Sequence, residues 1–197
     1  MRLVLASASP RREELLRQVR LGFEVRPADI DETRFPDEPP AAYVERVARA
    51  KAEAVAGPGL IVVGADTTVV HEGRIMGKPG HPEEARAMLR LLQDDVHEVF
   101  TGLAVASWDG AARTRSAVDI AEVHFLPMTD DEIVRYVESG EPLDKAGSYA
   151  LQGRGGAFVR KVNGSPFTVI GLPIHLLARL VAASGTDLDV FREEPAG

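Results

Sequence analysis

The chain has 197 residues, with 30 acidic and 23 basic side chains, which gives a formal net charge of −7 at pH 7. This length suits one ordinary domain, or two small lobes that share a core. The absence of cysteine excludes a disulfide scaffold, a thiolate zinc site and a cysteine nucleophile. The acidic balance predicts no stable nucleic-acid binding, since phosphate-binding surfaces are normally basic. No apolar run reaches the roughly 18 residues of a membrane span, so we expect a soluble, intracellular protein.

The first half of the chain alternates short apolar runs with helical patterns. A strand is expected at residues 3–6, and a helix follows with Ser9 as its N-cap and Pro10 at its first position. The next helix is expected over residues 41–56. A central strand, 60–65, and a hairpin across residues 69–76 complete this half.

The second half predicts antiparallel pairing. Asp109-Gly110 is a strong hairpin turn between strands expected at 96–107 and 117–126. Amphipathic or capped helices are expected from Pro82, from Thr129 to Gly140, and over residues 174–183, and a second hairpin is expected at Asn163-Gly164. Strands that alternate with helices but also form hairpins predict a mixed sheet in an α/β or α+β architecture.

The segment from Ser7 to Arg12 is a candidate anion site. Two serine hydroxyls, Ser7 and Ser9, precede two guanidinium groups, Arg11 and Arg12, at the expected start of a helix. Backbone N–H groups and guanidinium groups together suit a phosphate. The alternative is a solvated face on which Glu13 and Glu14 balance the arginines, and the spacing alone leaves both open.

Lys51 and Asp66 are unusual for their positions. Lys51 shares a helical stripe with Val44, Val47 and Val55, so it points where apolar residues point. It is either a snorkelling lysine at the edge of the stripe or a cation for phosphate. Asp66 follows the expected strand 60–65, where a carboxylate serves as a turn cap or as a metal ligand or base.

Further charged residues occur at Asp31-Glu32 and at Lys78. The chain has no Walker A motif, no complete G-x-G-x-x-G, no H-E-x-x-H and no G-x-S-x-G. Cations that suit phosphate and carboxylates that suit a hard cation are what remain, and this is the composition of a phosphoryl-transfer site.

A set of short motifs covers nearly the whole chain in order: residues 5–16 (LASASPRREELL), 29–32 (DIDE), 50–52 (AKA), 64–67 (GADT), 77–79 (GKP), 97–102 (HEVFTG), 141–147 (EPLDKAG), 151–153 (LQG) and 169–173 (VIGLP). Taken together, these motifs resemble the Maf family of nucleoside triphosphate pyrophosphatases.

The resemblance implies a two-lobed fold, similar to inosine triphosphatases, around a mixed and bent sheet with a cleft between the lobes. Residues 1–190 would form this single catalytic domain, and residues 191–197 a loose tail. The implied reaction converts a nucleoside triphosphate to the monophosphate and pyrophosphate with a divalent cation, Mg²⁺ or Mn²⁺. The implied location is the cytoplasm, with no membrane partner and a homodimer as a possible assembly.

The resemblance also implies roles for particular residues. The triphosphate would be surrounded by Ser7, Ser9, Arg11, Arg12, Lys51 and Lys78. Glu32 and Asp66 would hold the cation, and Asp66 would also accept a proton from the attacking water.

Three positions separate the branches of the family. The branch acting on dTTP and UTP is similar to this chain in having Arg11, Thr67 and Gln152, whereas the branch acting on 7-methyl-GTP tends to have an aromatic residue, Gln and Glu there. The amide of Gln152 suits the O4/N3–H edge of thymine or uracil. Two alternatives stay open: a 7-methyl-GTP pyrophosphatase, and a septum-formation regulator that acts through a binding partner.

Overall fold

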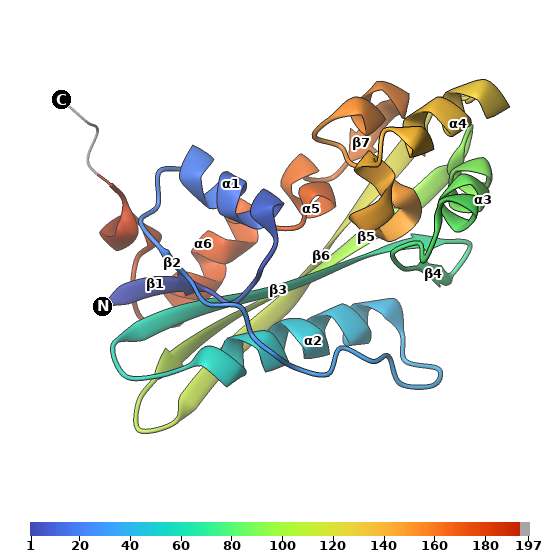
Figure 1. Cartoon of the computed structure of the whole chain (residues 1–197). Coiled ribbons are helices and arrows are strands. Elements are labelled where there is room, and N and C mark those ends of the chain that lie inside the picture. The colour runs from blue at the N-terminus through green and yellow to red at the C-terminus, as the bar shows by residue number, and fades with distance from the viewer. Residues whose placement is uncertain (194–197) are drawn as a thin grey trace. The chain divides into compact units, whose positions relative to one another are not determined.

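The structure is a computed structural model, and it describes residues 1–193. Seven strands form one mixed sheet in the order β2-β1-β3-β5-β6-β7, and β4 pairs with β3 outside this path (Figure 1). The expectation of a mixed α/β architecture is therefore confirmed. The described chain divides into two compact units: residues 1–66, 101–119 and 171–193 form unit 1, and residues 67–100 and 120–170 form unit 2.

Three strands contribute residues to both units. They are β3 (Leu60–His71), β5 (Val96–Trp108) and β6 (Ala112–Phe125). Unit 1 also contains β1 (Arg2–Leu5), β2 (Glu24–Val25), α1 (Pro10–Gln18), α2 (Pro40–Val55), α6 (Ile174–Ala183) and the 3-10 turn η4 (Leu188–Phe191). Strand β1 pairs in parallel with both β2 and β3, which places Leu5 opposite Val63.

Helix α2 packs closely on the sheet of unit 1 because the facing residues are small. A Cβ on Gly64 would lie 2.2 Å from the carbonyl oxygen of Ala48, and one on Gly102 would lie 2.2 Å from that of Val44. No side chain larger than hydrogen fits at either glycine unless the helix moves. The surrounding core of this unit is built largely from alanine and valine. The sequence therefore fixes the distance between α2 and β3.

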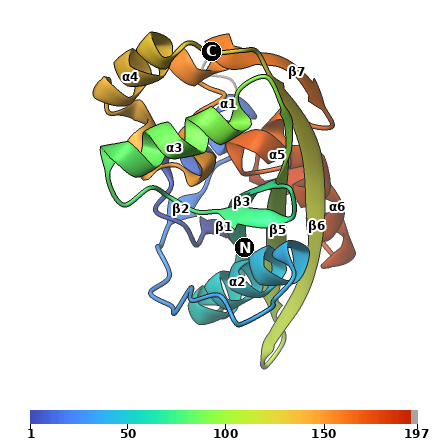
Figure 2. The ribbon, with the colours of Figure 1, turned by 90° about the vertical axis from the view of Figure 1, so that its right-hand side faces the viewer.

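Unit 2 has its own apolar core, formed by residues that include Val69, Leu89, Phe125 and Ile133. Its remaining elements are β4 (Arg74–Met76), α3 (Pro82–Leu92), α4 (Asp130–Glu138), β7 (Val159–Asn163), α5 (Pro166–Ile170), and the 3-10 turns η1 (Glu141–Asp144), η2 (Ala146–Ser148) and η3 (Arg154–Phe158). Helices α3 and α4 pack side by side (Figure 2). Their amphipathic faces supply much of this core.

Three sequence expectations are corrected by the structure. The hairpin expected at Asn163-Gly164 is wrong, because Gly164 leads into α5, whose first residue is Pro166, and β7 pairs instead with the preceding strand β6. The strand expected from residue 117 begins earlier, at Ala112. The sequence did not predict its first residues because they are mostly polar and show no apolar pattern. Strand β3 continues to His71, so Asp66 lies within the strand and not at its end.

Part of the segment expected to be a loose tail is attached to unit 1. The N–H of Gly22 donates to the carbonyl of Phe191, which is buried, and the N–H of Glu193 donates to the carbonyl of Arg20. Residues 194–197 of that expected tail lie outside the described residues.

Candidate active site

Lys51, Asp66 and Glu32 form an ion-pair cluster in unit 1. The Nζ atom of Lys51 lies 3.0 Å from Oδ1 of Asp66 and 3.0 Å from Oε1 of Glu32. Lys51 and Asp66 are buried, whereas the Glu32 side chain is about half exposed, at 49%. The interpretation of Lys51 as a snorkelling surface lysine is therefore excluded. A buried cation held between two carboxylates is expensive to desolvate, which marks a candidate functional site.

Two elements bring this cluster together. Lys51 belongs to the stripe of α2 that faces the sheet, and Asp66 lies on β3 two residues after Gly64. The close packing of α2 on Gly64 holds the helix near enough to β3 for the ammonium to reach the carboxylate. Gly64 thus allows the contact between Lys51 and Asp66, and Gly64 and Asp66 both belong to the motif of residues 64–67.

Arg12 is the second buried cation of unit 1. Its Nε donates to the carbonyl oxygen of Gly171 at 2.9 Å, and its Nη1 donates to Oγ of Ser7 at 2.9 Å. Burial lowers the pKa of the Arg12 guanidinium, and the nearby carboxylates of Asp66 and Glu32 act in the opposite direction. Arg12 is therefore within electrostatic reach of the Lys51 cluster and stays charged, as arginine does in proteins.

Ser9 and Arg11 lie beside Arg12 at the start of α1. Ser9 is the N-cap, but its side chain makes no capping hydrogen bond; instead its N–H donates to Oγ of Ser7. The charge of Arg11 contributes to lowering the pKa of Arg12, so the two guanidinium groups are close. The alternative was a solvated face on which Glu13 and Glu14 balance Arg11 and Arg12. Glu13 forms an ion pair with Arg17.

Tyr43 is a member of this site that the sequence analysis missed. Burial raises the pKa of its phenol, and the carboxylates of Asp66 and Glu32 raise it further. The phenol is therefore a hydrogen-bond donor near both carboxylates at neutral pH. Its signal was present in the sequence, because Tyr43, Val47 and Lys51 follow one another at four-residue steps along α2.

The loop that carries Glu32 is fastened to α2 by Arg46. The guanidinium of Arg46 donates to both carboxylate oxygens of Glu38, at 2.7 and 2.8 Å, and to the carbonyl of Thr33 at 3.0 Å. It also lies 4.1 Å from the centre of the Phe35 ring. A bidentate arginine pair combined with ring stacking gives a well-defined geometry. No sequence signal pointed to this clamp.

The three other expected site residues belong to unit 2. Lys78 is exposed in the loop after β4, and this loop is tied to η2 by a hydrogen bond from Gly147 N–H to the Gly77 carbonyl at 3.1 Å. Gln152 is exposed in the turn before η3, and Thr67 is half buried on β3, directly after Asp66. The structure thus gathers Ser7, Ser9, Arg11, Arg12, Glu32, Lys51 and Asp66 within unit 1.

The donor set of unit 1 fits a hard divalent cation. Among the described residues there is no group of three or more His, Cys, Asp or Glu side chains that could hold a metal ion by itself. Mg²⁺ is commonly held by one or two carboxylates, with waters and substrate phosphates as the other ligands. Glu32 and Asp66, which converge on one ammonium, satisfy that requirement.

Comparison with known proteins decides the family. The sequence matches the family described as Maf-like protein over residues 2–184. The chain belongs to the Maf family. Among curated Maf relatives, the dTTP/UTP pyrophosphatase of Anaeromyxobacter dehalogenans (strain 2CP-C) is 53% identical, with 95% of this chain and 96% of that protein covered. The dTTP/UTP pyrophosphatase of Moorella thermoacetica is 47% identical, with coverages of 95% and 97%.

A solved structure supports the fold. The Staphylococcus aureus Ham1 protein superposes with a TM-score of 0.52, at 16% sequence identity, and the match covers 93% of this Maf chain and 100% of that chain. At this identity the likeness concerns the fold alone. No helix in the described part of the chain is long and apolar enough to cross a membrane.

Proposed function

We propose that this protein hydrolyses dTTP and UTP to the monophosphate and pyrophosphate. The observation that carries the proposal is the buried Lys51–Asp66 pair with Glu32 and Arg12 around it, in a chain about half identical to dTTP/UTP pyrophosphatases. Buried cations beside carboxylates suit a reaction in which negative charge moves onto a leaving phosphate.

The chemistry follows from the residues of unit 1. Water attacks the α-phosphorus, the bond between that phosphorus and the oxygen bridging to the β-phosphorus breaks, and pyrophosphate leaves with the bond electrons. Asp66 accepts the proton of the attacking water. The guanidinium groups of Arg11 and Arg12 and the ammonium of Lys51 stabilise the charge that accumulates on the leaving group. Ser7 and Ser9 donate hydrogen bonds to phosphate oxygens.

A divalent cation, Mg²⁺ or Mn²⁺, belongs to this proposal. Glu32 and Asp66 would hold it, because both carboxylates converge on Lys51 and hard cations prefer oxygen ligands. A bound cation supplies charge neutralisation at the phosphates and lowers the pKa of coordinated water. Lys51 then orients the two carboxylates that it contacts.

The residues of unit 2 have the remaining roles. Lys78 provides a further cation for the triphosphate, Gln152 reads the pyrimidine edge through its amide, and Thr67 donates a hydrogen bond to the substrate. With Arg11, Thr67 and Gln152 at the three branch positions, a pyrimidine nucleotide is favoured over 7-methyl-GTP. A cytoplasmic location and a possible homodimeric assembly are part of the same proposal.

Product analysis tests the proposed reaction. The purified protein is incubated with dTTP, UTP, CTP and 7-methyl-GTP in the presence of Mg²⁺ or Mn²⁺, and the products are separated by ion-exchange chromatography. We expect dTMP or UMP together with pyrophosphate. Preferred turnover of 7-methyl-GTP would assign the other branch, and no turnover of any nucleotide would favour a role through a binding partner.

A further inference from the structure

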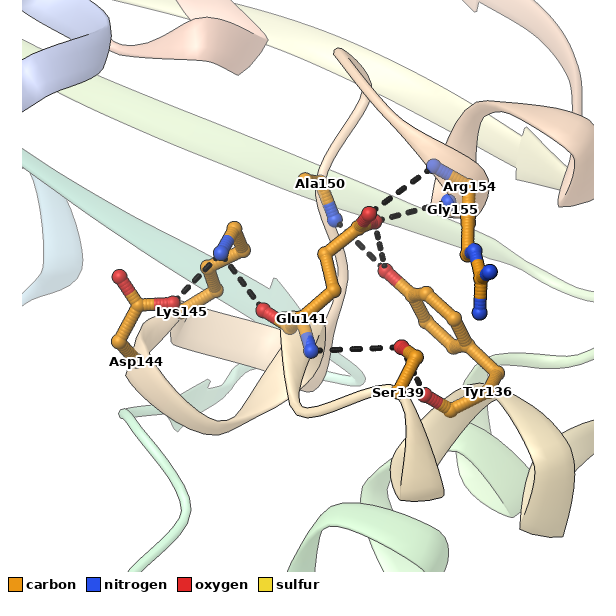
Figure 3. A network of polar contacts seen from close by, with 8 residues as sticks. All are labelled: Tyr136, Ser139, Glu141, Asp144, Lys145, Ala150, Arg154 and Gly155. Carbon is orange, nitrogen blue, oxygen red and sulfur yellow. Dashed lines mark hydrogen bonds and ion pairs between the residues drawn. The ribbon is translucent and has the colours of Figure 1, made fainter.

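The carboxylate of Glu141 ties three segments of unit 2 together (Figure 3). Its Oε1 accepts hydrogen bonds from the hydroxyl of Tyr136 at 2.8 Å and from the N–H of Gly155 at 3.0 Å. Its Oε2 accepts one from the N–H of Arg154 at 3.0 Å. The side chain of Glu141 thus connects η1 to α4 and to the start of η3. The proposed reaction gives this carboxylate no role, so its three hydrogen bonds point to another one.

The turn that these bonds hold carries Gln152. The hydroxyl of Tyr136 also accepts a hydrogen bond from the N–H of Ala150 at 3.2 Å, so backbone groups on both sides of Gln152 are held. The next residue, Gly153, has φ +138°, and a Cβ there would lie 2.7 Å from Oε2 of Glu141. Only glycine lets the backbone pass so close to the carboxylate. The turn is therefore shaped around Glu141.

The charges of the network suit a permanent anchor. Burial acts to raise the pKa of Glu141, but hydrogen bonds from Gly155, Arg154 and Tyr136 outweigh it, so the pKa is lowered. Burial, together with the hydrogen bond to Glu141, raises the pKa of Tyr136. An ionised carboxylate thus accepts from a protonated phenol and two amides, which is the strong form of the hydrogen bond.

The base of η1 is held as well. The ammonium of Lys145 donates to the carbonyl oxygen of Glu141 at 2.6 Å and to Oδ1 of Asp144 at 2.5 Å. The N–H of Glu141 donates to Oγ of Ser139 at 3.3 Å. The backbone of Glu141 is consequently fixed on both sides, as Figure 3 shows. Because its backbone is held in this way, the side chain of Glu141 can fix the position of the segment that it bonds, at the start of η3.

We propose that Glu141 is a positioning residue for base recognition: it fixes the turn 150–155 and thereby the direction of the Gln152 amide. This inference rests on the proposed function, in which Gln152 reads the pyrimidine. The proposal gives Glu141 no direct contact with the substrate, since both of its oxygens already accept hydrogen bonds from within unit 2. Gln152 is exposed and receives its geometry from the backbone that these bonds hold.

A double-mutant cycle tests this inference. Glu141→Gln replaces one acceptor oxygen by an NH₂ group, which leaves an amide of Arg154 or Gly155 without its acceptor. We expect about a tenfold loss of kcat/KM for UTP and dTTP. In a Gln152→Ala background the same change should add less than about twofold, since Glu141 acts through Gln152. Equal losses in both backgrounds would overturn the proposal and make Glu141 a general stabiliser of unit 2.

Hydrogen exchange gives a readout that needs no substrate. At least one of the amides of Arg154 and Gly155 should exchange faster in Glu141→Gln, whereas Glu138→Gln, an exposed change at the end of α4, should leave both unchanged. Unchanged exchange in Glu141→Gln would contradict the proposal. If Glu141→Gln fails to fold, Tyr136→Phe is used: it removes the hydroxyl that donates to Glu141 and accepts from the N–H of Ala150, and its effect on kcat/KM should likewise depend on Gln152. If the parent protein does not cleave UTP, the proposed function fails; if it does and the cycle is additive, only this inference fails.

Discussion

The ammonium of Lys51 lies 3.0 Å from the carboxylate of Asp66, although the two residues belong to different elements, α2 and β3. Both are buried, and Glu32 reaches the same ammonium from a neighbouring loop. This contact depends on the glycine-lined packing of α2 on the sheet. Substitutions of the charged residues and substitutions of the packing glycine therefore test this contact in two different ways.

Asp66→Asn tests the assigned base. The change keeps the shape of the side chain but removes its charge and its ability to take a proton. We expect kcat for UTP to fall at least about 100-fold, with the circular dichroism spectrum unchanged. Glu53→Gln, an exposed change on α2, is the control and should retain parental activity. A rate for Asp66→Asn within a few-fold of the parent, at saturating substrate and cation, would make Asp66 structural.

Lys51→Met tests the ion pair through stability. Removing the ammonium leaves the buried carboxylate of Asp66 without its direct partner, so we expect the free energy of unfolding to fall by roughly 3 kcal/mol. Adding Asp66→Asn should recover part of this loss, because the unpaired charge disappears with it. Denaturant unfolding of the parent, both single variants and the double variant measures this coupling. Losses that simply add would show that the two groups are not coupled.

Gly64→Ala tests the packing that brings the pair together. The new Cβ would lie 2.2 Å from the Ala48 carbonyl oxygen and 2.7 Å from the Ala52 nitrogen, so α2 must move. We expect a loss of about 1–3 kcal/mol in stability and a fall in kcat. Gly57→Ala is the matched control, since its Cβ would meet nothing closer than 3.7 Å. If the two alanine variants behave alike, the close approach of α2 has no functional importance.

His97 predicts a pH dependence of stability. Burial, with a smaller effect from His71, lowers its pKa to about 3, while its Nε2 lies 2.8 Å from the hydroxyl of Tyr149. Between about pH 6.5 and 3 the unfolded chain therefore binds a proton that the folded chain does not. The free energy of unfolding should fall in this range as the pH falls, by up to about 1.4 kcal/mol per pH unit from this residue.

The matching experiment compares unfolding of the parent and of His97→Gln between pH 6.5 and 5. The variant should show a shallower slope, by about one proton, because glutamine does not titrate. His81→Asn, which changes an exposed histidine and keeps a capping side chain at α3, should retain the parental slope. Identical slopes in the parent and in His97→Gln would show that His97 does not resist protonation.

Gln152→Glu tests how the base is read. The substitution removes the amide donor and adds a negative charge, so a carboxylate would face O4 of the pyrimidine. We expect kcat/KM for UTP and dTTP to fall about ten- to a hundredfold relative to that for 7-methyl-GTP, whose base offers N–H donors. Steady-state kinetics on all three nucleotides measures the ratio. An unchanged ratio would leave the branch assignment to Arg11 and Thr67 alone.

The sequence predicted those features of the fold that depend on local patterns. The helix 174–183 and the capping box of Thr129 with Glu132 are found where periodicity and capping chemistry indicated. The hairpin at Asn163-Gly164 was wrong because the turn signal is local, whereas Pro166 directly afterwards begins a helix. Pairing of β7 with β6 depends on a distant segment of the chain, since Asn163 lies opposite Glu122.

The candidate site also contains residues that local patterns predicted and contacts that they did not. Lys51 was found because a lysine interrupts an apolar stripe, and Tyr43 could have been found from the same stripe. The bond from Arg12 to the Gly171 carbonyl joins residues 159 positions apart, and the Glu38–Arg46 clamp and the Glu141 network depend on loops without periodicity. Such contacts are set by tertiary packing, which a single sequence does not display.

Hydrolysis of UTP in oxygen-18-labelled water, with mass spectrometry of both products, tests the central claim most directly. Attack on the α-phosphorus predicts that the label enters UMP and that pyrophosphate carries none. Asp66→Asn, run beside the parent, should form neither product at an appreciable rate. Label in pyrophosphate, or release of UDP and labelled orthophosphate, would contradict the account.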